Sequence, residues 1–183
     1  HDPHAERYVY GTVYAADTVE VFRSPAYLER LNNPTPWTAA VAPSFKNFLR
    51  VACERIAHAG TGDGGSMATI RFDLSSPDAA AQLTQKAQDL VTAILHLDGV
   101  CAVHLGLARS EVSMVRTKET ELRSQMNEQG FDAVLLIEGS AFAGLKASVP
   151  QAQQLALATG CLAHATAALY ETAFSLTSED MGQ

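Results

Sequence analysis

The chain has 183 residues, 47% hydrophobic and 18% charged, so it can bury a full core and is not an intrinsically disordered chain. Its formal net charge of -7, with no cluster of Lys and Arg, argues against a nucleic-acid partner. No apolar run approaches the ~20 residues that span a bilayer, so we expect no membrane partner. We predict one α+β domain over residues 1–183.

The three cysteines, Cys53, Cys101 and Cys161, lie far apart in apolar contexts. Their odd number and wide spacing argue against a disulfide framework, and no CxxC pair indicates a metal site. We expect them to be small core residues in a reducing compartment. We therefore predict a cytoplasmic protein without a bound metal.

The first strand and helix are predicted before residue 45. Residues 7–15 alternate tyrosine and threonine with small or aliphatic residues, which is the period-two pattern of a strand with two different faces. Ser24-Pro25 begins a helix, and the proline-rich stretch 32–36 interrupts it, because proline lacks an N–H donor. We expect a broken helical crossover that resumes over residues 37–44.

Two further strands with a glycine-rich connection follow. Residues 48–56 and 67–74 each alternate in side-chain type, and the run from Gly60 to Gly65 between them predicts a hairpin with a flexible tip. A phosphate-binding loop is the alternative interpretation. The run lacks the Gly-Lys pair of a P-loop and joins two strands rather than a strand and a helix, so the hairpin is favoured.

The clearest helix begins after Ser76-Pro77-Asp78, which supplies a cap and a first-turn proline. Its apolar residues recur at spacings of three and four, which is the pattern of a helix with one buried face. These residues are Ala80, Leu83, Ala87, Leu90, Val91, Ile94 and Leu95. Gly99 ends the segment, and residues 100–108 are predicted to form the fourth strand.

The rest of the chain predicts a polar excursion and another strand-helix-strand unit. Residues 110–130 are rich in charge and are expected to lie in solvent, with Gly130 ending the excursion. Strands are expected over residues 132–139 and 167–176, with a helix over 140–159 between them.

Strand, helix and strand thus follow one another three times, which suggests an internal pseudo-repeat. A βαββαβ window in this order is a ferredoxin-like unit, in which right-handed crossovers place both helices on one face of an antiparallel sheet. The other sheet face must then be covered by something else.

Three segments carry a resemblance to a known superfamily. They are Tyr10 to Tyr14, Asn33 to Thr38 continuing through Pro43, Phe45 and Asn47, and Asp132 to Gly139. In these segments the chain resembles uncharacterised bacterial members of the dimeric α+β barrel superfamily, ferredoxin-like proteins whose sheets pack face to face between subunits or duplicated halves. The resemblance implies barrel-type packing of the second sheet face and a homodimer. The low share of charged residues fits a partner subunit, although an ordinary alanine-rich surface explains it equally well.

If the apolar side of each strand faces the helices, the opposite sides form an aromatic and polar interior. From these sides we take Tyr10, Tyr14, Arg50, Glu54 and Arg71 as candidate ligand-binding residues. An enclosed group of charges of both signs is either an ion-pair network that orders the barrel or a ligand site. Trp37 in the proline-rich break is a further candidate, as a lid over the barrel mouth or as an anchor for its loop.

His104, inside the fourth strand, is the candidate catalytic residue, because imidazole takes up and releases protons near neutral pH. A satisfied core histidine is the simpler interpretation, and an axial ligand to haem iron is another. Glu138 ends the next strand and is interpreted as a solvated strand end or an inward-pointing carboxylate.

Members of the superfamily include monooxygenases without cofactors, haem-using enzymes and small-molecule binders, so the resemblance does not choose a function. We expect a protein that binds a small organic ligand in a sheet-lined pocket, in an enzymatic version as a cofactor-independent oxygenase-like enzyme. A non-catalytic homodimeric assembly module is the alternative, and a haem-binding protein is a further one.

Overall fold

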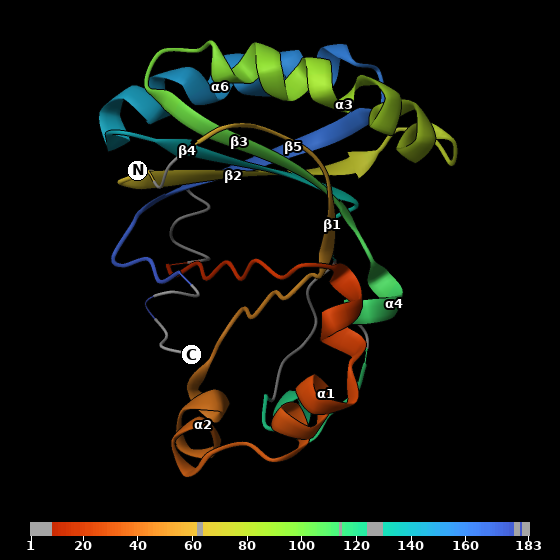
Figure 1. Ribbon diagram of the computed structural model, residues 1–183, viewed down its shortest axis with the longest axis vertical. Coiled ribbons are helices and arrows are strands. Elements are labelled where there is room, and N and C mark those ends of the chain that lie inside the picture. The colour runs from red at the N-terminus through yellow and green to blue at the C-terminus, as the bar shows by residue number, and fades with distance from the viewer. Residues whose placement is uncertain (1–8, 62–63, 114, 124–129, 178–179, 181–183) are drawn as a thin grey trace.

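The protein is described by a computed structural model that covers residues 9–61, 64–113, 115–123, 130–177 and 180. Five antiparallel strands form one sheet, and two long helices pack on one of its faces (Figure 1). The strands are β1 (Cys53–Gly60), β2 (Ser66–Leu74), β3 (Val100–Ala108), β4 (Ala133–Gly139) and β5 (Leu162–Glu171). The helices are η1 (Val19–Arg23), α1 (Pro25–Asn32), α2 (Pro36–Val41), η2 (Ala42–Ser44), α3 (Ala79–Leu95), α4 (Ser110–Ser113), α5 (Lys118–Glu121) and α6 (Phe142–Ala158).

The order of strands in the sheet is β1-β3-β4-β2-β5, and every neighbouring pair is antiparallel. β1 and β5 are the two edges, so the sheet is open rather than closed into a barrel. The predictions of an α+β fold, an antiparallel sheet and helices on one of its faces are confirmed.

The core lies between the sheet and the two helices α3 and α6. The predicted stripe of α3 is buried at Leu83, Ala87, Leu90, Val91 and Ile94. It packs against the apolar side of the strands, and burial of each large aliphatic side chain contributes about 1.5–3 kcal/mol. The largest buried side chains of the sheet are Ile70, Phe72, Val103, Leu105, Leu135 and Ile137.

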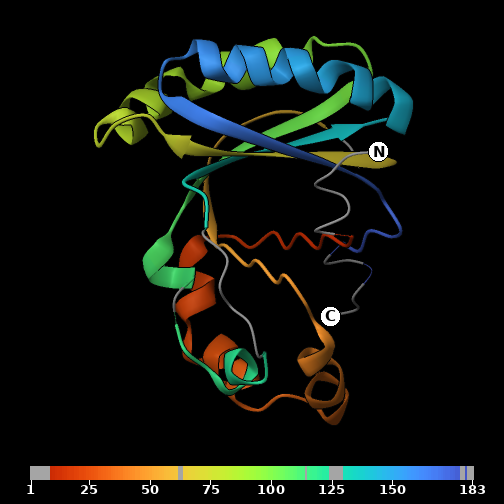
Figure 2. The same cartoon turned by 180° about the vertical axis from the view of Figure 1, so that it is seen from behind.

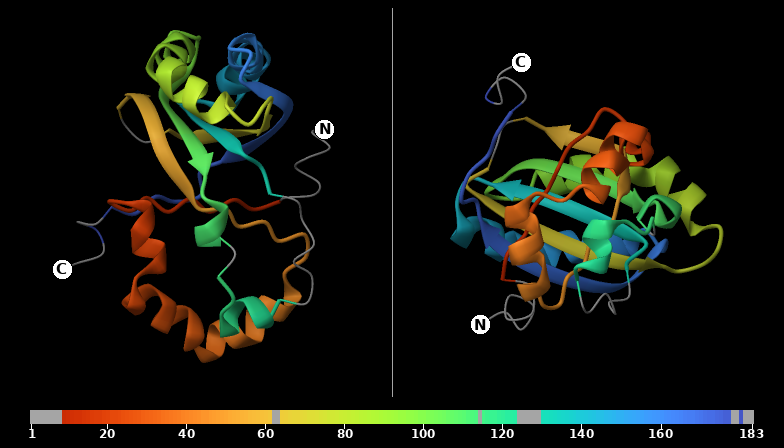
Figure 3. Two further views of the ribbon diagram at one scale, coloured as in Figure 1. Left: turned by 90° about the vertical axis from the view of Figure 1, so that its right-hand side faces the viewer. Right: turned by 90° about the horizontal axis from the view of Figure 1, so that it is seen from below.

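A second layer lies on the other side of the sheet (Figures 1 and 2). It contains the short helices on either side of Asn33 and those of the polar excursion, as the side and bottom views show (Figure 3). The backbone N–H of Lys118 donates to Oδ1 of Asn32 at 3.1 Å and joins α5 to α1. We call this part, residues 17–52, 110–113 and 115–123, the lower layer.

The broken helix of the sequence prediction is present. α1 begins at Pro25, where Oγ of Ser24 accepts a hydrogen bond from the backbone N–H of Tyr27 at 3.2 Å. α2 begins at Pro36, where Oγ1 of Thr35 accepts from the N–H of Thr38 at 3.1 Å. Each helix thus has a hydroxyl N-cap and a proline at N1.

The predicted first strand, residues 7–15, is not a strand in its described part. Residues 9–15 are exposed and lie outside the five-stranded sheet, and residues 7 and 8 lie outside the described part of the chain. The helices that follow are therefore no crossover between paired strands. The alternating pattern shows a local preference for extended backbone, but residues 9–15 do not pair with any strand of this sheet.

The predicted hairpin around Gly60 to Gly65 is wrong. β1 pairs with β3, and two strands, β3 and β4, separate it from β2. Gly60 has φ +84°, a left-handed conformation that suits glycine, and the chain leaves β1 there rather than turning back beside it. Alternation identified both strands but carried no information about which strands pair.

Two strands begin at other residues than predicted. β1 begins at Cys53, five positions after the start of the predicted strand 48–56. β5 runs from Leu162, where Cys161 and Leu162 are buried, and ends before Phe174, which is exposed. Burial against α6 fixed the position of β5, whereas the sequence pattern alone placed it later.

Within the described residues, no helix has the length and apolar character needed to cross a membrane.

The bend at Gly60 gives a test of the fold. A Cβ at this position would collide with the carbonyl oxygen of Cys101 and lie 2.7 Å from Cδ1 of Leu95. We expect Gly60→Ala to lower the free energy of unfolding by roughly 2 kcal/mol or more, because strain at positive φ adds to the collision. Urea denaturation measures the change.

Gly144→Ala is the matched control. Gly144 lies in α6, and its added Cβ would meet only ordinary contact, with Cα of Gly99 at 3.7 Å. We expect this variant to be up to about 1 kcal/mol more stable, since alanine is the better helix former. Equal stabilities of the two variants would contradict the account of the bend.

Candidate functional site

The sheet face opposite α3 and α6, here called the open face, carries polar side chains in a mainly apolar setting. Cross-strand partners share a face, so the register defines rows across it. One row contains His58, His104, Leu136, Thr69 and Ala168. The next row contains Ala102, Glu138, Met67 and Tyr170.

The two rows bring together the imidazole of His104 and the carboxylate of Glu138. Nε2 of His104 lies 3.4 Å from Oε1 of Glu138, at the long end of hydrogen-bond distance. The side chains are 25% and 15% exposed. The ring of His58 is nearly parallel to that of His104, at 8° and with 6.1 Å between centroids. The site is therefore a partly buried His–Glu pair flanked by a second imidazole.

The glycine-rich connection holds the carboxylate in place. The backbone N–H of Gly64 donates to Oε2 of Glu138 at 2.8 Å. Thr172 fixes Gly64 from the other side, because its Oγ1 donates to the Gly64 carbonyl at 2.9 Å. A carboxylate with one oxygen bound to the backbone keeps its other oxygen directed at His104.

This arrangement can move a proton. With a proton on Nε2, His104 donates to Glu138 and exposes the lone pair of Nδ1 as a base; with the ring doubly protonated, the carboxylate stabilises the imidazolium. A histidine oriented by a carboxylate is a common general acid–base unit.

Two of the predicted site residues, His104 and Arg71, lie on the open face. Arg71 is half-buried on β2, one row beyond His104, where its register partners are Val134 and Thr166. Strand parity predicted both positions correctly.

The other candidate ligand-binding residues lie elsewhere. Tyr10 and Tyr14 are 91% and 79% exposed on the N-terminal segment, and Trp37 is 70% exposed on α2. Arg50 is half-buried in the lower layer, outside any strand. These residues do not line one enclosed space within a single chain.

Glu54 is displaced by a β-bulge. It pairs with Leu107, which packs on the helix-covered side, whereas the register shift between Arg55 and Ala57 returns His58 to the open face. Simple alternation could not show this irregularity. The predicted strand ended at Ile56, so the sequence analysis did not include His58 among the candidate residues.

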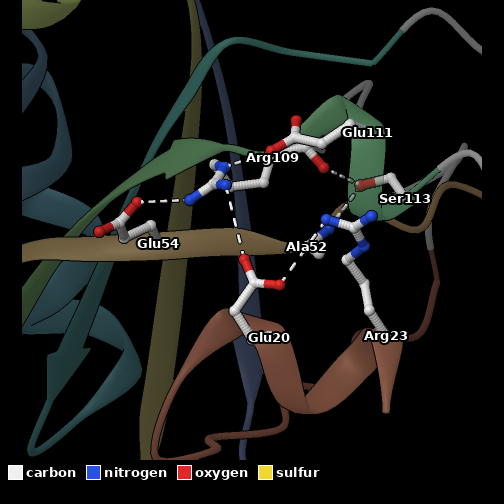
Figure 4. Close-up of polar contacts among 7 residues, drawn as sticks. All are labelled: Glu20, Arg23, Ala52, Glu54, Arg109, Glu111 and Ser113. Carbon is white, nitrogen blue, oxygen red and sulfur yellow. Dashed lines mark hydrogen bonds and ion pairs between the residues drawn. The ribbon is translucent and has the colours of Figure 1, made fainter. Parts of the chain in front are cut away.

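Glu54 instead belongs to a cluster around Arg109 (Figure 4). Nη1 of Arg109 lies 2.8 Å from Glu54, Nε lies 2.5 Å from Glu111, and Nη2 lies 3.6 Å from Glu20. The hydrogen bond to Glu111 is the main cause that raises the pKa of Arg109. The cluster joins β1, η1 and α4, and its cation is already matched by carboxylates.

Backbone bonds reinforce the same joint (Figure 4). The N–H of Arg109 donates to the carbonyl of Ala52 at 2.8 Å, and the N–H of Ala52 donates to Oγ of Ser113 at 2.9 Å. A hollow of about 300 Å³ lies beside the cluster. It is lined by Glu54, Leu74, Ala80, Leu107, Ala108, Arg109, Ser110, Phe131 and Asp132. We interpret the cluster as the joint between the sheet and the lower layer.

The cysteines offer no reactive thiolate at Cys53. Burial raises the pKa of the Cys53 thiol to about 12, so this group stays protonated near neutral pH. All three cysteines are free. Among the described residues, no three His, Cys, Asp or Glu side chains are grouped so that they could hold a metal ion. The role of His104 as a haem ligand stays a prediction.

No known protein family matches the chain, and no curated protein sequence matches it significantly.

The Arg109 joint predicts a pH dependence. The hydrogen bond from Arg109 is the main cause that lowers the pKa of the Glu111 carboxyl. A lowered folded-state pKa stabilises the fold at pH values above the ordinary carboxyl pKa, and this stabilisation is lost as the pH falls through the folded-state pKa. We expect Glu111→Gln to melt at a lower temperature than the wild type at pH 7, with the difference vanishing in acid.

Asp89→Asn, at an exposed position of α3, is the control. Its melting temperature should differ little from that of the wild type, and this small difference should not disappear as the pH falls from 7 to 3. A constant difference between Glu111→Gln and the wild type from pH 7 to pH 3 would contradict the assignment of the joint.

Proposed function

We propose that the protein binds a small organic ligand against the open face, with His104 as its proton-transfer group. The single observation that carries the proposal is the His104–Glu138 pair. A partly buried imidazole and carboxylate lie beside Ala102 and Leu136, where an apolar pair would stabilise the sheet at no cost of desolvation. A few convergent polar groups in a mainly apolar setting are typical of a ligand site.

The order of elements supports a ferredoxin-like assignment for residues 66–171. From β2 to β5 the chain follows βαββαβ, and the sheet order β3-β4-β2-β5 places the first and third of these strands in the centre. β1 is then an additional edge strand beside β3. This assignment agrees with the resemblance to dimeric α+β barrels, in which a sheet face of this kind lines a ligand pocket.

The enzymatic version of the proposal is a cofactor-independent oxygenase-like reaction, in which His104 first takes a proton from the bound substrate. Glu138 would stabilise the resulting imidazolium, and the backbone of Gly64 would keep that carboxylate in place. Arg71, one row away, is the candidate partner for an acidic group of the substrate.

A ligand screen tests the site at His104. Compounds from a panel of small aromatic and carboxylic acids that raise the melting temperature of the wild type should lose that effect in His104→Asn, because the variant lacks the ionisable ring. The control His96→Asn removes an exposed imidazole at the end of α3, on the other side of the sheet, and should keep the response. A response that survives in His104→Asn would show that the ligand binds elsewhere.

A second candidate is a homodimeric assembly module, and the N-terminal segment favours it. Val9, Tyr10, Val13 and Tyr14 are between 51% and 91% exposed. The segment crosses the sheet near Tyr170, whose ring lies 3.6 Å from the position of a Cβ on Gly11. Such exposed apolar side chains with strand preference are common where a second chain packs.

Replacing both exposed tyrosines tests self-association. We expect sedimentation velocity to show a dimer for the wild type and a shift toward monomer for Tyr10→Ser/Tyr14→Ser, because apolar contact area is lost. Both side chains are exposed, so the melting temperature of the isolated chain should change little. A wild type that sediments as a monomer at every concentration would rule out this candidate.

A further inference from the structure

The first part of the described chain is packed far less tightly than the rest. Of residues 9–52, only Ala42 is buried. Helices α1 and α2 contain no buried residue, and Trp37 and Phe45 are 70% and 41% exposed. Helices this short are marginal in water on their own, because most of their stability comes from packing of an apolar face. This part of the chain therefore needs a covering surface that the described residues do not supply.

The N-terminal segment, residues 9–15, has the composition of a strand but no strand partner. It runs below the open face, outside the sheet (Figures 1 and 2). Its backbone forms no hydrogen bond with the described residues of the chain. Valine, tyrosine and threonine favour extended backbone, and the segment contains no charge and no proline. Its N–H and C=O groups are therefore available to the edge of a sheet.

One edge of the sheet, β1, is protected against the addition of a strand. It carries the charged side chains of Glu54 and Arg55, and a bulge follows them. Further along, Nε2 of Gln88 on α3 donates to the carbonyl of His58 at 3.2 Å. Charges, bulges and covering side chains are the usual means by which proteins block an edge.

The other edge, β5, is less protected. β5 pairs with β2 on one side and with no strand of the described chain on the other. Its bulge is confined to its beginning, where His164 has a φ of +50° and the register shifts between Arg71 and Asp73 of β2. Residues 166–169 after the bulge contain no charge and no proline. An uncharged, straight edge of this kind is a template for another strand.

We propose that the N-terminal segment of each subunit adds as a strand to the free edge of β5 in a second copy of the chain. The chain supplies both halves of the contact, so one two-fold axis forms it twice. Residues 9–15 and 166–169 are uncharged, so the net charge of -7 on each copy does not set like charges opposite one another there. The segment already passes β5, since the Tyr170 ring lies 3.6 Å from the position of a Cβ on Gly11. This inference rests on the assembly candidate proposed above and names the segments that join the two copies.

Backbone amide hydrogen exchange, measured residue by residue by NMR, tests the pairing. Sedimentation velocity first gives the protein concentrations at which the wild type is a dimer and a monomer. In the dimer we expect alternate amides of residues 9–15 to exchange at least about tenfold more slowly than in the monomer, because every second amide of an edge strand faces its neighbour. Amides of residues 166–169 that point away from β2 should slow as well.

Adjacent proline variants separate backbone pairing from side-chain contact. Thr12→Pro and Val13→Pro each remove one N–H, and neighbouring amides point to opposite sides, so one of the two removes a donor of the added strand. That variant should dimerise about tenfold or more weakly than its matched control, Thr12→Ala or Val13→Ala, which keeps the N–H. Residues 9–15 are exposed, so the melting temperature of the monomer should not change.

The possible outcomes distinguish this inference from the proposals above. A dimer in which the amides of residues 9–15 exchange as fast as in the monomer would overturn the strand addition but leave the assembly candidate in place. Equal dimerisation of both proline variants and their alanine controls would have the same meaning. Protection that does not depend on protein concentration would contradict the inference, because the segment would then pair within its own chain. A monomer at every concentration would overturn both the strand addition and the assembly candidate, without bearing on a ligand at His104.

Discussion

The structure depends on burial of one face of an open antiparallel sheet beneath two helices. α3 and α6 cover one side of the five strands, and the side chains of the core between them and the sheet are apolar, from Ala68 to Ile137. This packing leaves the second face without helices of comparable length. The polar groups of that face then have to find partners within the sheet, in the lower layer or in a ligand.

Two polar clusters of this protein differ in how completely their charges are matched. Arg109 faces Glu20, Glu54 and Glu111 and is partly exposed, so it is complete as a structural joint between β1, η1 and α4. Arg123 is more deeply buried, and its Nε and Nη1 have no acceptor among the described residues.

The His104–Glu138 pair on the open face is held in place by the backbone. Glu138 accepts a backbone hydrogen bond from Gly64 and is directed at His104, so the glycine-rich connection positions the carboxylate without being a hairpin tip or a phosphate loop. A pair held in this way spends little conformational entropy when a ligand arrives.

Features that depend on neighbouring residues could be predicted from the amino-acid pattern. The apolar spacing of residues 80–95 predicted α3, the Ser-Pro and Thr-Pro pairs agree with the starts of α1 and α2, and alternation placed Arg71 and His104 on one face. Contacts between distant segments were needed to show that β1 pairs with β3 and that a bulge moves Glu54 to the other side. Periodicity records which way adjacent side chains point, whereas strand partners and charge neighbours arise from contacts between residues far apart in the chain.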